Sequence, residues 1–198
     1  MDEEAAKKSL HRYLRESRSA LVWKLDGLSD YNVRRPLTPH GTNLLGLVKH
    51  LSGCEIGYFG AVFGRPFPHN PPWLTSTTPN VDMWAAPDES RASIIDLYQR
   101  ACAHSDHTIA KLPLDATGEV PLWTPQDRVV TLHQILVHMI AETSRHAGHA
   151  DIVREIIDET TGRTPDEASQ SPVADPTYWS RLHEQIEDAA RSARHPTT

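Results

Sequence analysis

The chain has 198 residues, which is enough for one domain with a full hydrophobic core. Its net charge of −6 argues against a nucleic-acid-binding protein, because such proteins usually carry a basic face. No apolar run reaches the roughly 18 residues that a membrane-spanning helix needs, which argues against a membrane protein. Only two cysteines occur and the N-terminal segment lacks the pattern of a secretory signal, so we expect a cytoplasmic location.

Four segments show the periodicity of amphipathic helices, and proline-rich loops separate them. We predict long helices over residues 3–25, 42–63, 87–112 and 131–157, and a shorter helix over 176–193. Thr42 is a suitable N-cap for the second helix, and Pro113 closes the third. No strand pattern with a period of two persists anywhere in the chain. The sequence therefore predicts an all-α fold, a four-helix bundle with long loops and a short C-terminal helix.

We expect the bundle to occupy residues 1–165 and a C-terminal extension to occupy residues 166–198. The longest link between predicted helices is residues 65–86, and a loop of this length in a compact domain is usually functional or disordered. Its Trp73, Met83 and Trp84 indicate that it folds back over part of the bundle. Trp84 is a candidate substrate-binding residue at the roof of a pocket, although anchoring of the loop is the simpler role.

The fourth predicted helix carries one continuous stripe at helical spacing, which should face the bundle core. The stripe consists of Ile135, Met139, Glu142, His146, His149, Val153 and Ile156. A carboxylate and two imidazoles thus interrupt an otherwise apolar face. Buried carboxylates are normally paired or bound to metal, and residues four apart lie on the same side of a helix. Glu142 and His146 could therefore hold one ion together, and a buried His–Glu hydrogen bond is the competing interpretation.

A third ligand is expected from a facing helix, where His50 lies among apolar residues at helical spacing. Two imidazoles and one carboxylate suit a catalytic zinc site with an open position, and they also suit Fe(II), Ni(II) or Mn(II). His50 taken alone would more often be a hydrogen-bonded core residue. Cys54, one turn later, is more typical of a small buried hydrophobic residue than of a ligand.

Two segments carry a resemblance to a known family, TNLLGLVKHLSGCEIGYFGAVFGRPFP and HMIAETSRHAGHADIVREIID. With a histidine in the middle of the second helix and ExxxHxxH on the last, the chain resembles the DinB-like superfamily over roughly residues 5 to 160. It is similar in particular to the actinobacterial mini-circle protein branch. Many members carry two histidines four apart on the last helix. Here Glu142 stands at the first of these positions, as in the mycothiol-dependent maleylpyruvate isomerases.

The resemblance implies an up-down-down-up bundle, frequent homodimers, and a divalent metal held by His50, Glu142 and His146. It also implies a thiol-dependent transferase or isomerase that uses mycothiol as co-substrate and acts on a small electrophilic substrate. His149 is our candidate for the catalytic proton transfer, and Arg145 is a candidate for binding the substrate. A metal-dependent hydrolase and a non-catalytic, stress-associated metal-binding protein are the alternatives.

Overall fold

The computed structural model describes residues 2–169, 175 and 177–193, which are mostly helical. The long helices are α1 (Glu3–Trp23), α3 (Leu44–Glu55), α4 (Arg91–Lys111) and α5 (Leu132–Asp158). The short ones are α2 (Asp30–Arg34), the π turn η1 (Ile56–Gly60), the 3₁₀ turns η2 (Ala61–Phe63) and η3 (Pro72–Thr75), α6 (Pro165–Ser169) and α7 (Tyr178–Ser192). Two short strands, β1 (Thr117–Glu119) and β2 (Val129–Thr131), form a hairpin. The prediction of an all-α bundle is confirmed.

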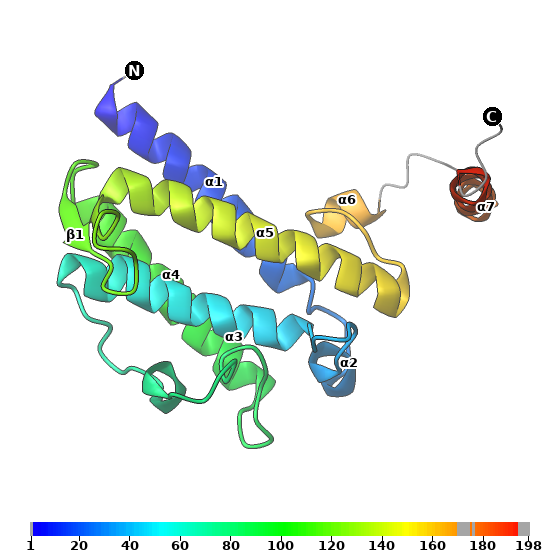
Figure 1. Cartoon of the computed structure of the whole chain (residues 1–198), viewed down its shortest axis with the longest axis horizontal. Helices are drawn as coiled ribbons and strands as arrows, with labels where there is room; N and C mark the ends of the chain where they lie inside the picture. Colours follow the sequence, from blue (N-terminus) through cyan, green and yellow to red (C-terminus); the bar gives the residue numbers. More distant parts are fainter. Residues whose placement is uncertain (1, 170–174, 176, 194–198) are drawn as a thin grey trace.

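The four long helices lie side by side in one bundle (Figure 1). α1 packs mainly along α5, and α3 packs against both α4 and α5. α1 and α5 run in one direction while α3 and α4 run in the other, so the long segment between α3 and α4 returns the chain along the bundle (Figure 1). This is the up-down-down-up order that the resemblance implied. It places the middle of α3 beside the middle of α5.

Side-chain caps decide where the helices begin. Asn43, not Thr42, caps α3, and its side chain accepts a hydrogen bond from a backbone N–H of the first turn. Ser90 caps α4, so the acidic residues before it lie outside the helix that was predicted to include them. Thr131 caps α5 at the predicted boundary. The helix predicted over 42–63 changes to a π turn after Glu55, a local widening of the helix that is often found at functional sites.

The expectation that no strand forms is wrong at one place. Strands β1 and β2 pair antiparallel with Thr117 opposite Thr131. Each strand has three residues, which is too short for an alternating pattern to show in the sequence. The hairpin lies against η2, where a Cβ added to Gly118 would come within 2.5 Å of the carbonyl oxygen of Val62. This contact fixes the hairpin at the end of the bundle where α3 finishes and α5 begins.

The predicted stripe on α5 is buried over most of its length, as Met139, His146 and Val153 show. Ile156 is the exception, since it is 57% exposed. At this end α5 extends beyond α1 and α3 (Figure 1). The predicted C-terminal helix forms as α7, which buries none of its described side chains. Pro176, where that prediction began, lies outside the described residues.

A buried ion network ties α1, α3 and α4 together. The guanidinium of Arg18 donates to both carboxylate oxygens of Glu55, at 2.7 and 2.6 Å. It also donates to Asp106 Oδ1 at 2.6 Å, and His11 Nε2 lies 2.8 Å from the same oxygen. Arg18 is 5% exposed and Glu55 is fully buried. Breaking a pair of this kind leaves an uncompensated buried charge, so the network fixes how these helices face one another.

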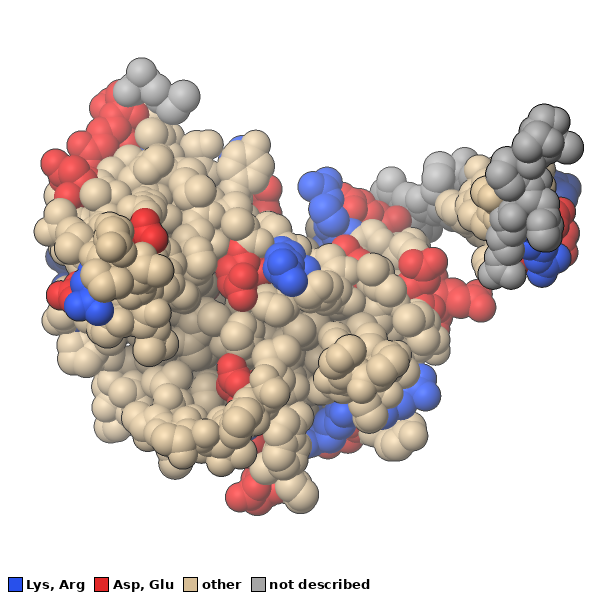
Figure 2. Space-filling view, in the orientation of Figure 1, with Lys and Arg blue, Asp and Glu red and all other residues tan. Residues whose placement is uncertain are grey.

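The surface carries charges of both signs. On the face shown in Figure 2, Lys and Arg side chains lie in small separate groups beside Asp and Glu, and most of the surface is formed by other residues. Among the described residues, no helix has both the length and the apolar character needed to cross a membrane.

Candidate metal and thiol site

The three ligands predicted from the sequence meet between α3 and α5. Oε1 of Glu142 lies 3.4 Å from His50 Nε2 and 3.0 Å from His146 Nε2. The two imidazole rings meet edge to face, with centroids 4.9 Å apart. His50 and Glu142 are partly exposed, whereas His146 is buried. The structure therefore places both histidines beside the same carboxylate oxygen, although His146 is not in the group of described residues whose ligand atoms all lie within 4.8 Å of one another, which consists of His50, Cys54 and Glu142.

Cys54 joins this group, which the sequence did not favour. Its Sγ lies 3.5 Å from His50 Nε2, and one ligand atom from each of His50, Cys54 and Glu142 lies within 4.8 Å of the others. Ligand atoms around a tetrahedral zinc ion are about 3.3–3.7 Å apart, given the usual zinc–nitrogen and zinc–sulfur distances. Two of the separations here, 3.4 and 3.5 Å, fall in that range. Nitrogen, oxygen and sulfur donors at these spacings fit a divalent metal.

The electrostatic surroundings keep the imidazole of His146 neutral and the carboxylate of Glu142 charged. Burial, followed by the charge of His50, lowers the pKa of His146. Burial raises the pKa of Glu142, but His146 and His50 outweigh it and the pKa of that carboxyl is lowered. Burial and the nearby carboxylates, Glu142 foremost, raise the pKa of Cys54 to about 12. The group therefore offers a neutral imidazole and a carboxylate to a cation, the forms in which these residues bind metals.

Asp82 orients His50, and the sequence analysis missed it. Its Oδ2 lies 2.7 Å from His50 Nδ1, whereas Nε2, the other ring nitrogen, faces Glu142 and Cys54. If Nδ1 donates to this carboxylate, the lone pair of Nε2 is directed at Glu142 and Cys54. Metal-binding histidines almost always have such a partner on the second nitrogen. The only sequence signal was the length of the loop 65–86 that contains Asp82.

Lys49 holds the Asp82 loop on α3. Its buried ammonium donates to the carbonyl oxygens of Val81 and Trp84 at 2.9 and 3.0 Å, and to Glu89 Oε2 at 2.7 Å. One turn earlier on the helix, a Cβ added to Gly46 would lie 1.9 Å from the carbonyl oxygen of Met83. Only glycine permits so close an approach. The position of Asp82 is thus fixed by contacts along the N-terminal half of α3.

The remaining predicted site residues lie further away. His149 Nδ1 is 3.3 Å from His146 Nδ1, so His149 lies behind that ligand and is absent from the cavity lining. Arg145 is exposed on α5 and does not line the cavity either. Trp84 is 49% exposed outside the lining, while Trp73 of the same loop does line it. The structure thus gives His149 a position for orienting His146, and it does not bring Arg145 or Trp84 to the cavity.

A cavity of about 470 Å³ opens beside His50 and Cys54. α3, η1, the loop 73–82 and the hairpin form its walls. Glu142 and His146 are not in its lining, so they lie behind the cavity while His50 and Cys54 border it. A family model described as mycothiol S-transferase matches residues 9–159, which is most of the chain.

The chain belongs to the mycothiol S-transferase family.

This match confirms the resemblance to the DinB-like superfamily and covers most of α1 and all of α2 to α5, including all the site residues discussed above. Comparison with curated proteins found no match. The family description indicates a transferase whose reaction involves mycothiol.

Proposed function

We propose that this protein is a metal-dependent thiol S-transferase that joins mycothiol to a small electrophile. We further propose that His50, Glu142 and His146 hold the divalent metal, with zinc first and nickel, iron or manganese as the other possibilities. The observation that carries the proposal is the convergence of these side chains at the edge of the cavity, in a chain of the mycothiol S-transferase family. A cytoplasmic location and a homodimer belong to the same proposal.

The chain's own residues prepare the site for a thiol. Asp82 fixes the ring of His50, and His149 lies where it can do the same for His146. Most residues that line the cavity are apolar, so a bound electrophile would displace water from its walls. When bound, a divalent cation lowers the pKa of an adjacent thiol and so supplies a strong nucleophile at neutral pH. Cys54 is itself a poor nucleophile without a cation, because its raised pKa keeps it protonated.

Conjugation of mycothiol with monochlorobimane tests this reaction. A sulfur–carbon bond forms at the chloromethyl carbon, chloride leaves with its bonding pair, and the thiol proton passes to solvent. We expect about one metal ion per chain in protein purified without a histidine tag, and a fluorescent adduct that forms faster with protein than without it. Elemental analysis and mass spectrometry measure these two quantities.

The matched variants are His146→Ala and His69→Ala, since His69 is an exposed histidine away from the site. His146→Ala should lose both metal and conjugation, whereas His69→Ala should retain both. If both His50→Ala and His146→Ala retained the metal, these two histidines would not be its ligands. Adduct formation that is no faster than the uncatalysed reaction, with any low-molecular-weight thiol, would refute the transferase, and ester hydrolysis without thiol would favour a hydrolase.

The position of Cys54 supports one second candidate, a non-catalytic metal-binding protein. Structural zinc sites are typically closed by four protein ligands, and Cys54 Sγ lies within ligand distance of the group. If Cys54 were the fourth ligand, Cys54→Ala would greatly weaken metal binding and expose the ion to added thiol. The transferase proposal expects Cys54→Ala to retain most of its metal affinity. Chelator competition with the two proteins distinguishes the candidates.

A further inference from the structure

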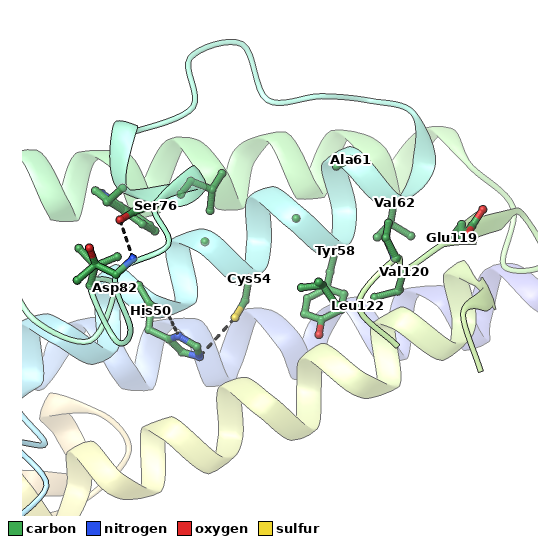
Figure 3. A pocket seen from close by; sticks show the side chains of 17 residues that line it. His50, Cys54, Tyr58, Ala61, Val62, Ser76, Asp82, Glu119, Val120 and Leu122 are labelled. Carbon is green, nitrogen blue, oxygen red and sulfur yellow. Dashed lines mark hydrogen bonds and ion pairs between the residues drawn. The ribbon is translucent and has the colours of Figure 1, made fainter. Parts of the chain in front are cut away.

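The cavity beside the site has two chemically different ends (Figure 3). Ser76, Thr78 and Asp82 bring polar groups to the end next to His50, which Trp73, Leu74 and Val81 also line. The other end, beyond Cys54, is lined by the ring of Tyr58, by aliphatic side chains of η2 and the hairpin, and by the carboxylate of Glu119 at its rim (Figure 3). His50 and Cys54 lie between the two ends (Figure 3). Such a division suits a reaction in which one polar and one apolar molecule meet at a central point.

The charges around the cavity are all negative or locally balanced. Two carboxylates, Asp82 and Glu119, are in the lining, and none of the lining residues is Lys or Arg. Glu142 adds a third carboxylate just behind His50. Lys49, which donates to the carbonyl oxygen of Val81 in the lining, pairs with Glu89 at 2.7 Å, and Arg128 pairs with Glu119 at 3.3 Å. The divalent metal proposed at His50, Glu142 and His146 would offset the carboxylates near it, so a negative substrate group would lack a cationic partner only at the hairpin end, where Arg128 already pairs with Glu119.

The wall that α3, η1 and η2 contribute to the cavity carries small residues at regular spacing. Gly53, Gly57 and Ala61 follow one another at steps of four along one wall, and a Cβ added to Gly57 would meet nothing within 4 Å. The ring of Tyr58 forms part of the lining and is held by Trp123 and His138, with centroids 6.0 and 4.7 Å from its own. Aromatic rings at these distances pack favourably and hold one another in place.

Leu122 completes the apolar end from the hairpin. It is 96% exposed although it belongs to the lining. A single exposed leucine on a surface needs no explanation. Here, however, the side chain stands beside an apolar cavity, where a bound hydrophobic molecule would cover it and gain the burial energy.

We propose that this apolar end is the acceptor subsite and that it selects an uncharged, hydrophobic electrophile of aromatic size in preference to a carboxylate-bearing one. The inference rests on the proposed function and specifies its second substrate, while the polar end receives the thiol.

The test compares 4-chloro-3,5-dinitrobenzamide with 4-chloro-3,5-dinitrobenzoate, which share the reacting carbon and differ in charge. Mycothiol attacks the ring carbon that carries chlorine, the sulfur–carbon bond forms, chloride leaves, and the thiol proton goes to solvent. Each rate is divided by the uncatalysed rate with the same thiol. We expect the normalised kcat/KM of the wild-type, metal-loaded protein to favour the amide at least roughly tenfold.

Two variants locate the selectivity in the subsite. Leu122→Lys places a cation at the apolar end and should reduce the preference for the amide toward unity. Ile152→Lys is the matched control, because Ile152 is exposed on α5 outside the lining, and it should leave the preference unchanged. Gly57→Leu should fill the cavity and weaken amide binding, whereas Gly57→Ala should keep most of it. Equal use of benzoate and benzamide, or equal effects of the two lysine variants, would overturn the proposal.

Equilibrium binding separates this proposal from the transferase itself. Both compounds are titrated into the metal-loaded protein without thiol, and chemical-shift changes are followed by NMR. Preferential binding of the amide, with shifts at Gly57 and Leu122, supports the subsite even if no conjugation occurs. Conjugation without any such preference refutes the subsite while leaving the transferase intact.

Discussion

Replacing Asp82 by asparagine isolates the role of the carboxylate that orients His50. The substitution keeps the shape of the side chain and removes its charge. The Nδ1 atom of His50 then faces a neutral amide, which can either accept a hydrogen bond through its oxygen or donate one through its NH2 group. Loss of such a partner typically weakens metal binding tenfold to a hundredfold, or about 1.4–2.8 kcal/mol. The side chains of His50 and Asp82 are 22% and 33% exposed, and solvent can replace part of the lost interaction. We therefore expect the lower half of that range.

Competition with a chromophoric chelator measures the zinc affinity of the purified protein. Asp88→Asn is the matched control, because Asp88 is an exposed residue of the same segment and the change in net charge is identical. The ¹⁵N NMR spectrum of the His50 ring in metal-free protein should also change in Asp82→Asn, since the preferred tautomer is no longer fixed. If the two variants bind zinc equally well, Asp82 does not orient a ligand and the assignment of His50 to the metal is weakened.

Three further predictions concern stability. Arg18→Met should destabilise the fold by about 3–5 kcal/mol in urea unfolding, because it leaves the charge of Glu55 buried and unpaired, and no loss would show that the pair is not closed in solution. Gly46→Ala should lower the melting temperature, because the added Cβ would meet the carbonyl oxygen of Met83. Gly148→Ala is the control, since its Cβ would meet nothing within 4 Å, and it should be neutral or stabilising by up to about 1 kcal/mol. A lower melting temperature for Gly148→Ala than for Gly46→Ala would contradict the packing of the loop on α3. Partial burial raises the pKa of the Asp106 carboxyl, but the contacts with His11 and Arg18 outweigh burial, so its pKa in the folded protein is lowered. The ionised carboxylate therefore stabilises the fold at pH values above the pKa of the unfolded chain, and this stabilisation is lost as the pH falls through the pKa of the folded protein. Asp106→Asn should therefore flatten the acid limb of the stability profile, and an unchanged limb in unfolding measured from pH 6 to 2 would exclude this carboxyl as its source.

The sequence alone predicted the four long helices and the positions on them of the proposed ligands. Helical periodicity is a local property, so the stripe containing Glu142 and His146 showed which side of α5 faces inward. The same reasoning placed His50 on an apolar face, and the structure brings it within 3.4 Å of Glu142. Thr131 marked the start of α5 because an N-cap acts over a single turn.

Tertiary structure alone decided what surrounds those ligands. Asp82 is 32 positions from His50 in the chain, and it reaches the ring because Lys49 and Gly46 hold its loop against α3. No local pattern encodes such a contact, since it depends on the path of an irregular segment. The same holds for the choice of Trp73 over Trp84 in the cavity wall and for the approach of Cys54 to Glu142, which is contributed by α5. Short-range spacing thus fixed the faces of the helices, while long-range packing fixed the shape and charge of the cavity between them.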